Sequence, residues 1–291
     1  MIKGSIVALV TPMHADGSLD WGSLDNLLDW HLAAGTAAIV AVGTTGESAT
    51  LDVGEHLKLI AHCVRRLDGR LPLIAGTGAN ATREAIELTR GAAGCGADAC
   101  LLVTPYYNRP SQRGLIEHYT AIATAVAVPL ILYNVPSRTA VDLGNDTALH
   151  LATLENIVGI KDATGDLERG RQLLEGAPQG FAVYSGDDGT AAELMLMGAA
   201  GNISVTANVV PERVAALCAA ALAGDSQTAH DIDASLSELN RALFVEANPM
   251  PVKYALARMG RMQSGIRLPL TLPEGSAAAQ IDAAIAGIMV Q

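Results

Sequence analysis

The chain has few charged and few aromatic side chains. Of its 291 residues, 17% are Asp, Glu, Lys or Arg and 3% are aromatic, and 19 basic residues against 30 acidic ones give a net charge of −11. Neutralising phosphate groups requires clustered Lys and Arg, and the sequence contains no basic run. We therefore expect neither nucleic acid nor a membrane surface as a partner, whereas a small anionic substrate needs only one or two local cations.

Targeting and membrane segments are also missing from the sequence. The N-terminal stretch is apolar but lacks the basic start and cleavage site of a signal peptide, and no apolar run reaches the ~18 residues of a membrane span. The four cysteines show no CxxC spacing. We expect reduced, buried thiols in a cytoplasmic protein.

Several catalytic motifs are absent as well. The seven histidines show no HxH or HExxH spacing, so we expect no metal, and no GxSxG motif indicates a hydrolase. Neither GxGxxG after a strand nor GxxxxGK[ST] is present, which disfavours a nucleotide. A lysine could hold pyridoxal phosphate, but we find no distinct phosphate cradle. We therefore expect no cofactor.

What the chain does have is a regular alternation of short apolar runs and longer amphipathic stretches. The runs cover residues 5–10, 37–42, 71–76, 99–104, 129–134, 157–161, 181–185 and 199–205. Each is too short for a helix and too continuous for a half-exposed strand, as is typical of parallel strands buried on both faces. Helix starts follow at Asp20, 80–84, Ser111 and Pro211.

Eight strand–helix units by about residue 223 predict a (β/α)8 TIM barrel. The alternative is an open doubly wound sheet, but its nucleotide motif is missing. From Asp225 onward the pattern is helical only, with a break at Asn248 and Pro249. We therefore predict a catalytic barrel at 1–224 and a small C-terminal helical region at 225–291.

Lys161 is the strongest candidate for chemistry, because enzyme sites in such barrels lie at the carboxyl ends of the strands. Of the four lysines it alone ends a predicted strand. Strict alternation places Ile157, Gly159 and Lys161 on one face of that strand and Val158 and Ile160 on the other. Burial favours the neutral, nucleophilic amine. The alternative is a structural strand-end lysine paired with Asp162 or a helix carboxylate.

Other strand ends carry polar groups that suit a keto acid. The glycine-bracketed turn at 43–46 offers backbone N–H groups and two threonine hydroxyls to a carboxylate, although such turns are common. Tyr106, Tyr107, Tyr133 and Tyr184 all follow or end predicted strands, and Tyr133 could carry a proton. Arg138 could bind a carboxylate bidentately, or could form a surface salt bridge.

The chain resembles the dihydrodipicolinate synthase (4-hydroxy-tetrahydrodipicolinate synthase) family over essentially its whole length. The matching motifs are GTTGE at 43–47, TPYYNRPSQ at 104–112, YNVPSRT at 133–139, GIKDATG at 159–165, SGDD at 185–188, ISVTAN at 203–208 and NPMPVK at 248–253. The turn, the tyrosine and the lysine are shared with other pyruvate-dependent lyases. The arginine in YNVPSRT and the paired tyrosines are more particular to the synthase.

This resemblance implies a class I lyase that condenses pyruvate with L-aspartate 4-semialdehyde in diaminopimelate and lysine biosynthesis. Lys161 would form an imine with pyruvate, and Arg138 would bind the carboxylate of the semialdehyde. Thr44, Thr45 and Gly186 would surround the pyruvate carboxylate and the imine, and Ile203 would add a backbone contact. Tyr133, Thr44 and Tyr107 would form a proton relay. Tyr107 would reach into a neighbouring subunit of a homotetramer built as a dimer of dimers.

The resemblance also implies a possible allosteric lysine site. Its matching residues are Ser48, Ala49, His56, Asn80, Glu84 and Tyr106. Val53 departs from the pattern, because strongly sensitive relatives carry an imidazole there. A valine side chain forms no hydrogen bond, so we expect weak or absent inhibition by lysine.

Two other functions compete with this interpretation. A lyase for 2-keto-3-deoxy sugar acids or N-acetylneuraminate needs the same lysine and tyrosine, but would prefer ligands for sugar hydroxyls where Arg138 stands. A non-catalytic keto-acid or amino-acid binding protein would be marked by loss of the lysine or tyrosine, and both are present.

Overall fold

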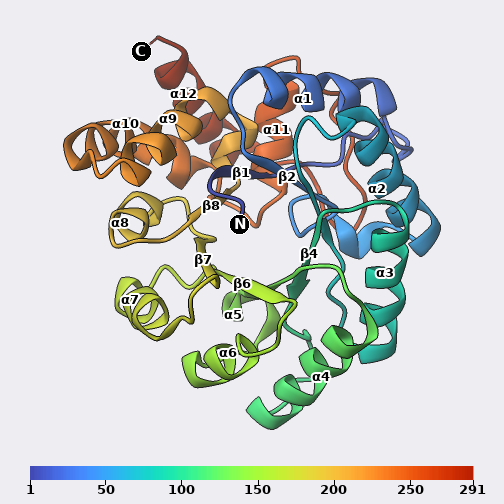
Figure 1. The fold of residues 1–291 in the computed structure, drawn as a ribbon. Helices are drawn as coiled ribbons and strands as arrows, with labels where there is room; N and C mark the ends of the chain where they lie inside the picture. Colours follow the sequence, from blue (N-terminus) through green and yellow to red (C-terminus); the bar gives the residue numbers. More distant parts are fainter. Residues whose placement is uncertain (291) are drawn as a thin grey trace.

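Eight parallel strands form a closed barrel in chain order, surrounded by helices (Figure 1). The computed structural model describes residues 1–290, with side chains as far as residue 288. The strands are β1 (Gly4–Ala8), β2 (Ala38–Ala41), β3 (Leu73–Gly76), β4 (Ala99–Val103), β5 (Leu130–Asn134), β6 (Ile157–Asp162), β7 (Ala182–Ser185) and β8 (Gly201–Ser204). Each overlaps one of the eight predicted runs, so the predicted TIM barrel is confirmed.

The barrel helices begin largely where the sequence indicates. They are α1 (Trp21–Ala33), α2 (Val53–Leu67), α3 (Thr82–Gly94), α4 (Gln112–Ala125), α5 (Pro136–Thr139), α6 (Asn145–Leu151), α7 (Leu167–Gly176), α8 (Ala191–Leu196) and α9 (Pro211–Leu222). The carboxylate of Asp20 caps α1 and the hydroxyl of Ser111 caps α4. The start of α3 differs, because Ala81 occupies its N-cap position and Asn80 lies outside the helix.

Two apolar layers lie on either side of the strands. Ile6 and Leu101 belong to the layer inside the barrel, whereas their neighbours Val7 and Leu102 pack outward under the helices. Successive side chains in a strand point to opposite faces, so a strand with apolar neighbours on both sides needs apolar residues at every position. This explains why the runs are continuous rather than alternating.

The alternation predicted for β6 is wrong in its first half. Leu130 pairs with Ile157, but the next residue, Ile131, pairs with Gly159, which leaves Val158 as an extra residue in a bulge. Ile157 and Ile160 consequently both pack in the outer layer, and Val158 packs against the inner one. The second half follows the prediction, because Lys161 pairs with the inward-facing Tyr133.

The residues after the barrel form α10 (Ser226–Ala242), α11 (Met250–Arg258) and α12 (Gly275–Val290). Helix α10 packs on α8 and α9, and α12 packs on α10 and α11. The division at residue 224 stays a prediction, since α10 packs directly on the last two barrel helices, α8 and α9 (Figure 1). None of the helices within residues 1–290 is both long and apolar enough to cross a membrane.

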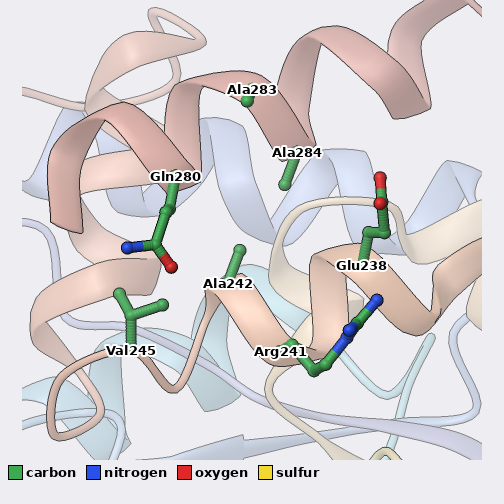
Figure 2. Close-up of a pocket in the computed structure, with 7 residues that line it drawn as sticks. All are labelled: Glu238, Arg241, Ala242, Val245, Gln280, Ala283 and Ala284. Carbon is green, nitrogen blue, oxygen red and sulfur yellow. The ribbon is translucent and has the colours of Figure 1, made fainter. Parts of the chain in front are cut away.

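A groove of about 300 Å³ lies between α10 and α12 (Figure 2). Its polar lining is Glu238, Arg241 and Gln280, and its remaining lining consists of alanines and Val245. It includes none of the strand-end residues predicted from the sequence, so it is separate from the site expected at the barrel mouth.

Candidate active site

Lys161 lies in β6 between β5 and β7, paired with Tyr133 on one side and Tyr184 on the other. Its side chain is buried, with 5% of the residue exposed, and its Nζ atom lies 4.5 Å from the centre of the Tyr133 ring. The strand therefore delivers an amine to the inner face of the barrel, next to the phenol that the sequence marks as a proton carrier.

The alternative partner for this lysine, Asp162, is engaged elsewhere. Its carboxylate accepts a hydrogen bond of 2.8 Å from Nε of Arg169 and another from the hydroxyl of Thr164. The amide of Asn134, at the end of β5, bridges Asp162 and Asp142. This polar network ties the ends of β5 and β6 together on the outer face. Within residues 1–290 Lys161 forms no ion pair, so the structural alternative of a pair with Asp162 is wrong.

Gly186 follows β7 and lies against the lysine stem. Its N–H donates to the carbonyl of Asp162 over 2.7 Å. A Cβ atom at this position would lie 2.7 Å from Cε of Lys161 and 2.7 Å from Cβ of Ala163, far inside ordinary contact. Only glycine therefore fits beside Lys161 in this arrangement.

Tyr184 and Ile203 belong to the wall of the barrel interior. Tyr184 is 3% exposed, and its hydroxyl donates over 2.9 Å to the carbonyl of Ile2, which precedes β1. The backbone of Tyr184 lies near the end of β7, but its hydroxyl faces away from the barrel mouth. Counting Tyr184 with Tyr106, Tyr107 and Tyr133 as a polar group of the site is therefore wrong. Burial raises the pKa of Tyr184 to about 12. Ile203, on β8, is 1% exposed in the same apolar layer.

The glycine-bracketed turn follows β2 and is held tightly in place. Thr11 donates from its hydroxyl to the carbonyl of Gly46 over 2.7 Å, and a side chain on Gly46 would press on the backbone of Val42 at 3.0 Å. Thr45 is buried, and its hydroxyl accepts a hydrogen bond of 3.0 Å from the amide of Asn248. The two threonines of the turn thus have different surroundings, since Thr44 lines a cavity.

That cavity, of about 340 Å³, joins residues of both predicted sites. Thr44, Arg138 and Asn248 line it, together with most of the predicted lysine-binding residues, namely Ser48, Ala49, His56, Glu84 and Tyr106. Asn80 is not among its lining residues; its carbonyl accepts a hydrogen bond from Asn108. Val53 also lines the cavity and is 54% exposed.

Two charged or titratable side chains along this cavity have fixed partners. Arg138 extends from α5, and its Nη2 donates to the main-chain carbonyl of Asn248 over 2.8 Å. His56, on α2, lies with Nε2 2.8 Å from the carbonyl of Gly76, and burial lowers its pKa. Among the side chains that the structure describes, through residue 288, Arg138 forms no salt bridge, which was its alternative role.

Tyr107 stands apart from the other predicted catalytic residues. It is 90% exposed and its backbone has a φ of 75°, in the left-handed region that L-residues adopt rarely. A side chain so exposed is not packed with Tyr133, which is 6% exposed. A single chain thus does not bring all three members of the predicted proton relay together.

Sequence reasoning gave no role to four residues that surround the turn. Glu47 is buried and paired with Lys253, and the N–H of Arg267 donates to the same carboxylate. Asn248 joins this set through its contact with Thr45. The motifs GTTGE and NPMPVK contain three of the four, but nothing in either motif indicates that they meet across about 200 positions.

No group of three or more His, Cys, Asp or Glu side chains in the described part of the chain could hold a metal ion. The side chains near the carboxyl ends of the strands supply an amine, a phenol, hydroxyls and a guanidinium. A (β/α)8 barrel that buries a lysine at the carboxyl end of a strand has the architecture of a Schiff-base-forming, class I aldolase-type lyase.

Comparison with known proteins places the chain within this class. The model of the dihydrodipicolinate synthetase family matches residues 1–287, and the chain belongs to that family. It is 63% identical over 271 residues to the 4-hydroxy-tetrahydrodipicolinate synthases of Cellvibrio japonicus and Stutzerimonas stutzeri, covering 93% of each chain. The crystal structure of the chloride-inhibited dihydrodipicolinate synthase from Acinetobacter baumannii, complexed with pyruvate, matches with a TM-score of 0.98 at 56% identity, covering 100% of both chains. The predicted family resemblance is confirmed.

Proposed function

We propose that this protein is a 4-hydroxy-tetrahydrodipicolinate synthase, which condenses pyruvate with L-aspartate 4-semialdehyde in diaminopimelate and lysine biosynthesis. The observation that carries the proposal is the buried amine of Lys161, beside the Tyr133 ring and against the one residue type that leaves room for it, Gly186. The 63% identity to synthases over nearly the whole chain supports the choice of substrates.

Pyruvate binds first in this proposal. The amine of Lys161 attacks the keto carbon, and the resulting carbinolamine loses water to leave an imine. Thr44 and Thr45 offer hydroxyl and N–H groups to the carboxylate, Gly186 lies beside the imine, and Ile203 adds its backbone at the wall. Tyr133 transfers protons to and from the carbinolamine oxygen.

Carbon–carbon bond formation follows at the methyl carbon of pyruvate. Loss of a methyl proton converts the imine to an enamine, whose carbon attacks the aldehyde of the semialdehyde. Arg138 receives the carboxylate of this second substrate, because its guanidinium matches a carboxylate bidentately. The amino group of the semialdehyde then attacks the imine carbon, closes the ring and releases Lys161.

The assembly proposed with this function is a homotetramer, built as a dimer of dimers, in the cytoplasm. The exposure of Tyr107 supports it, because an aromatic side chain that is 90% exposed in one chain is suited to burial by another. In that assembly Tyr107 completes the relay of Tyr133 and Thr44 in the neighbouring subunit.

Feedback control by lysine is proposed to be weak or absent. Ser48, Ala49, His56 and Glu84 line the cavity that extends from Arg138, which supports their assignment to one possible allosteric site. Val53 lines the same cavity without a polar atom in its side chain. Inhibition of the condensation by submillimolar lysine would overturn this expectation.

The test is condensation of pyruvate with L-aspartate 4-semialdehyde, coupled to a reductase that consumes the product. Lys161→Ala is expected to abolish turnover, whereas Lys58→Ala, at an exposed lysine on α2, is expected to leave it unchanged. Without turnover by the wild type, borohydride trapping with pyruvate decides between the alternatives. An adduct on Lys161 would indicate a lyase for a sugar acid or N-acetylneuraminate, and binding without an adduct would indicate a non-catalytic protein.

A further inference from the structure

We infer that Asn248, Lys253 and Arg267, together called here the C-terminal brace, are positioning residues for the pyruvate-binding turn. The inference rests on the proposed function, because it concerns the same reaction. The brace comes from the helical region after the barrel, yet its polar atoms contact Thr45 in the turn at 43–46 and Glu47, the residue that follows the turn. The three residues act through the turn, without contacting the reacting atoms themselves.

The brace contacts the carboxylate of Glu47, the residue directly after the turn. Its backbone has a φ of 57°, in the left-handed region that a non-glycine residue keeps only when its surroundings enforce it. Its carboxylate pairs with Lys253, and both side chains are fully buried, at 0% exposure. A buried carboxylate needs a partner, so Lys253 is what allows Glu47 to stay inside.

Arg267 holds the second oxygen of the same carboxylate and is itself firmly fixed. Its N–H donates to Oε2 of Glu47 over 3.2 Å. Its guanidinium forms two hydrogen bonds with Glu55, of 2.6 and 2.7 Å, and others with the carbonyls of Gly17 and Thr50. Both oxygens of Glu47 are thus held by groups from the C-terminal region.

Asn248 connects the residues proposed for the two substrates, Thr45 for pyruvate and Arg138 for the semialdehyde. Its side-chain amide donates to the hydroxyl of Thr45, whereas its main-chain carbonyl accepts from Arg138. One residue therefore fixes a threonine of the pyruvate turn through its side chain and the arginine proposed for the semialdehyde through its backbone. Substituting the side chain removes the first contact and keeps the second.

The brace acts on pyruvate because it holds the side chains of Thr45 and Glu47, whereas the bond from Thr11 to the carbonyl of Gly46 holds only the backbone of the turn. Without Lys253 the carboxylate of Glu47 loses its ion-pair partner, and the strained residue next to Gly46 is free to relax. Thr44 and Thr45 would move with it. A misplacement of about 1 Å in a binding group can cost up to about 100-fold in rate, so even a small shift of the turn is measurable.

The test compares Lys253→Met and Asn248→Ala with the wild type and with Lys3→Met, the same change at an exposed lysine before β1. Borohydride trapping over a range of pyruvate concentrations gives the half-saturating concentration, at a temperature well below each variant's melting point. We expect it to rise about 10-fold in both brace variants and to stay unchanged in Lys3→Met. In Asn248→Ala the KM for the semialdehyde should stay unchanged, because the carbonyl bound by Arg138 remains.

The outcomes separate this inference from the proposed function. Wild type that traps no pyruvate would refute the function itself. Wild type that traps pyruvate, with brace variants that saturate at the same concentration, would refute the brace alone and leave a purely structural role. If Lys253→Met does not fold, the test rests on Asn248→Ala, which leaves no buried charge unpaired. Its half-saturating pyruvate concentration and its KM for the semialdehyde then decide whether the brace positions the turn.

Discussion

Gly186 offers the sharpest test of the geometry around Lys161, the proposed nucleophile. In Gly186→Ala the new Cβ would lie 2.7 Å from Cε of Lys161, and an equal distance from Cβ of Ala163. The φ of Gly186 lies outside the left-handed region, so an alanine meets no backbone strain there. The perturbation is therefore steric and is directed at the lysine stem.

The expected loss in the rate of imine formation follows from the overlap of the new Cβ with its neighbours. Carbon atoms pack best at about 3.5–4.0 Å, so the contacts with Lys161 and with Ala163 both have to open by roughly 1 Å. Lys161 is the end of a flexible chain, whereas Ala163 is fixed by its own backbone N–H bond to the carbonyl of Asn134. We expect the lysine to move, and a 1 Å misplacement of a reacting group to slow imine formation by about 100-fold.

The assay is the rate of borohydride-trapped pyruvate adduct, read by mass spectrometry, beside the melting temperature of each variant. Gly189→Ala is the matched control, because its Cβ would meet Asp187 at an ordinary 3.6 Å in the same loop. Slow trapping in Gly186→Ala is expected at a temperature where the variant remains folded, together with a lowered melting temperature, because the contact with Ala163 also has to open. Trapping at the wild-type rate would mean that the reactive lysine does not occupy the position seen here.

Three further predictions concern binding, stability and pH. Arg138→Gln should raise the KM for the semialdehyde by about 10- to 100-fold, the value of a hydrogen bond to a charged group, and leave pyruvate trapping unchanged; an equal effect on both substrates would contradict its assignment. Arg169→Met leaves Asp162, whose side chain is 4% exposed, without its ion pair. It should lower the free energy of unfolding in urea by about 3 kcal/mol, and an unchanged midpoint would show that the hydrogen bonds from Asn134 and Thr164 suffice. Burial lowers the pKa of His31 from 6.5 to about 3. Between these two pH values the imidazole binds a proton in the unfolded state but not in the folded state. The free energy of unfolding therefore falls as the pH drops below 6.5 towards 3. The slope should be shallower by up to about 1.4 kcal/mol per pH unit in His31→Leu, and parallel curves would refute this.

The barrel and its mouth were predictable because their signals are local in the sequence. A strand buried on both faces must be apolar at consecutive positions, and each such run ends where its polar residues begin. The order of the runs alone then placed Lys161, Tyr133 and the turn at 43–46 at one end of one barrel. The assignment of substrates needed the family resemblance, because no spacing between residues distinguishes one aldehyde from another.

Other features depend on how distant segments meet, and so were not predictable. The bulge at Val158 is a register shift between β5 and β6, visible only when the two strands pair. The inward hydroxyl of Tyr184 depends on Ile2, 182 positions away. The pair of Glu47 and Lys253 spans 206 positions, and each residue alone reads as an ordinary charged residue of a turn or helix.

The division of β6 into two faces explains how a lysine and an aspartate can be neighbours in the chain without forming a pair. Alternation along the strand directs Lys161 into the barrel and Asp162 towards the helices. Arg169 and Asn134 then occupy the carboxylate, and through it they hold the strand ends that carry Lys161 and Tyr133. The strand thus keeps the charged network that stabilises the site on one face and the amine proposed to form the imine on the other. Changes to the network should therefore act first on stability, and changes around the amine first on imine formation.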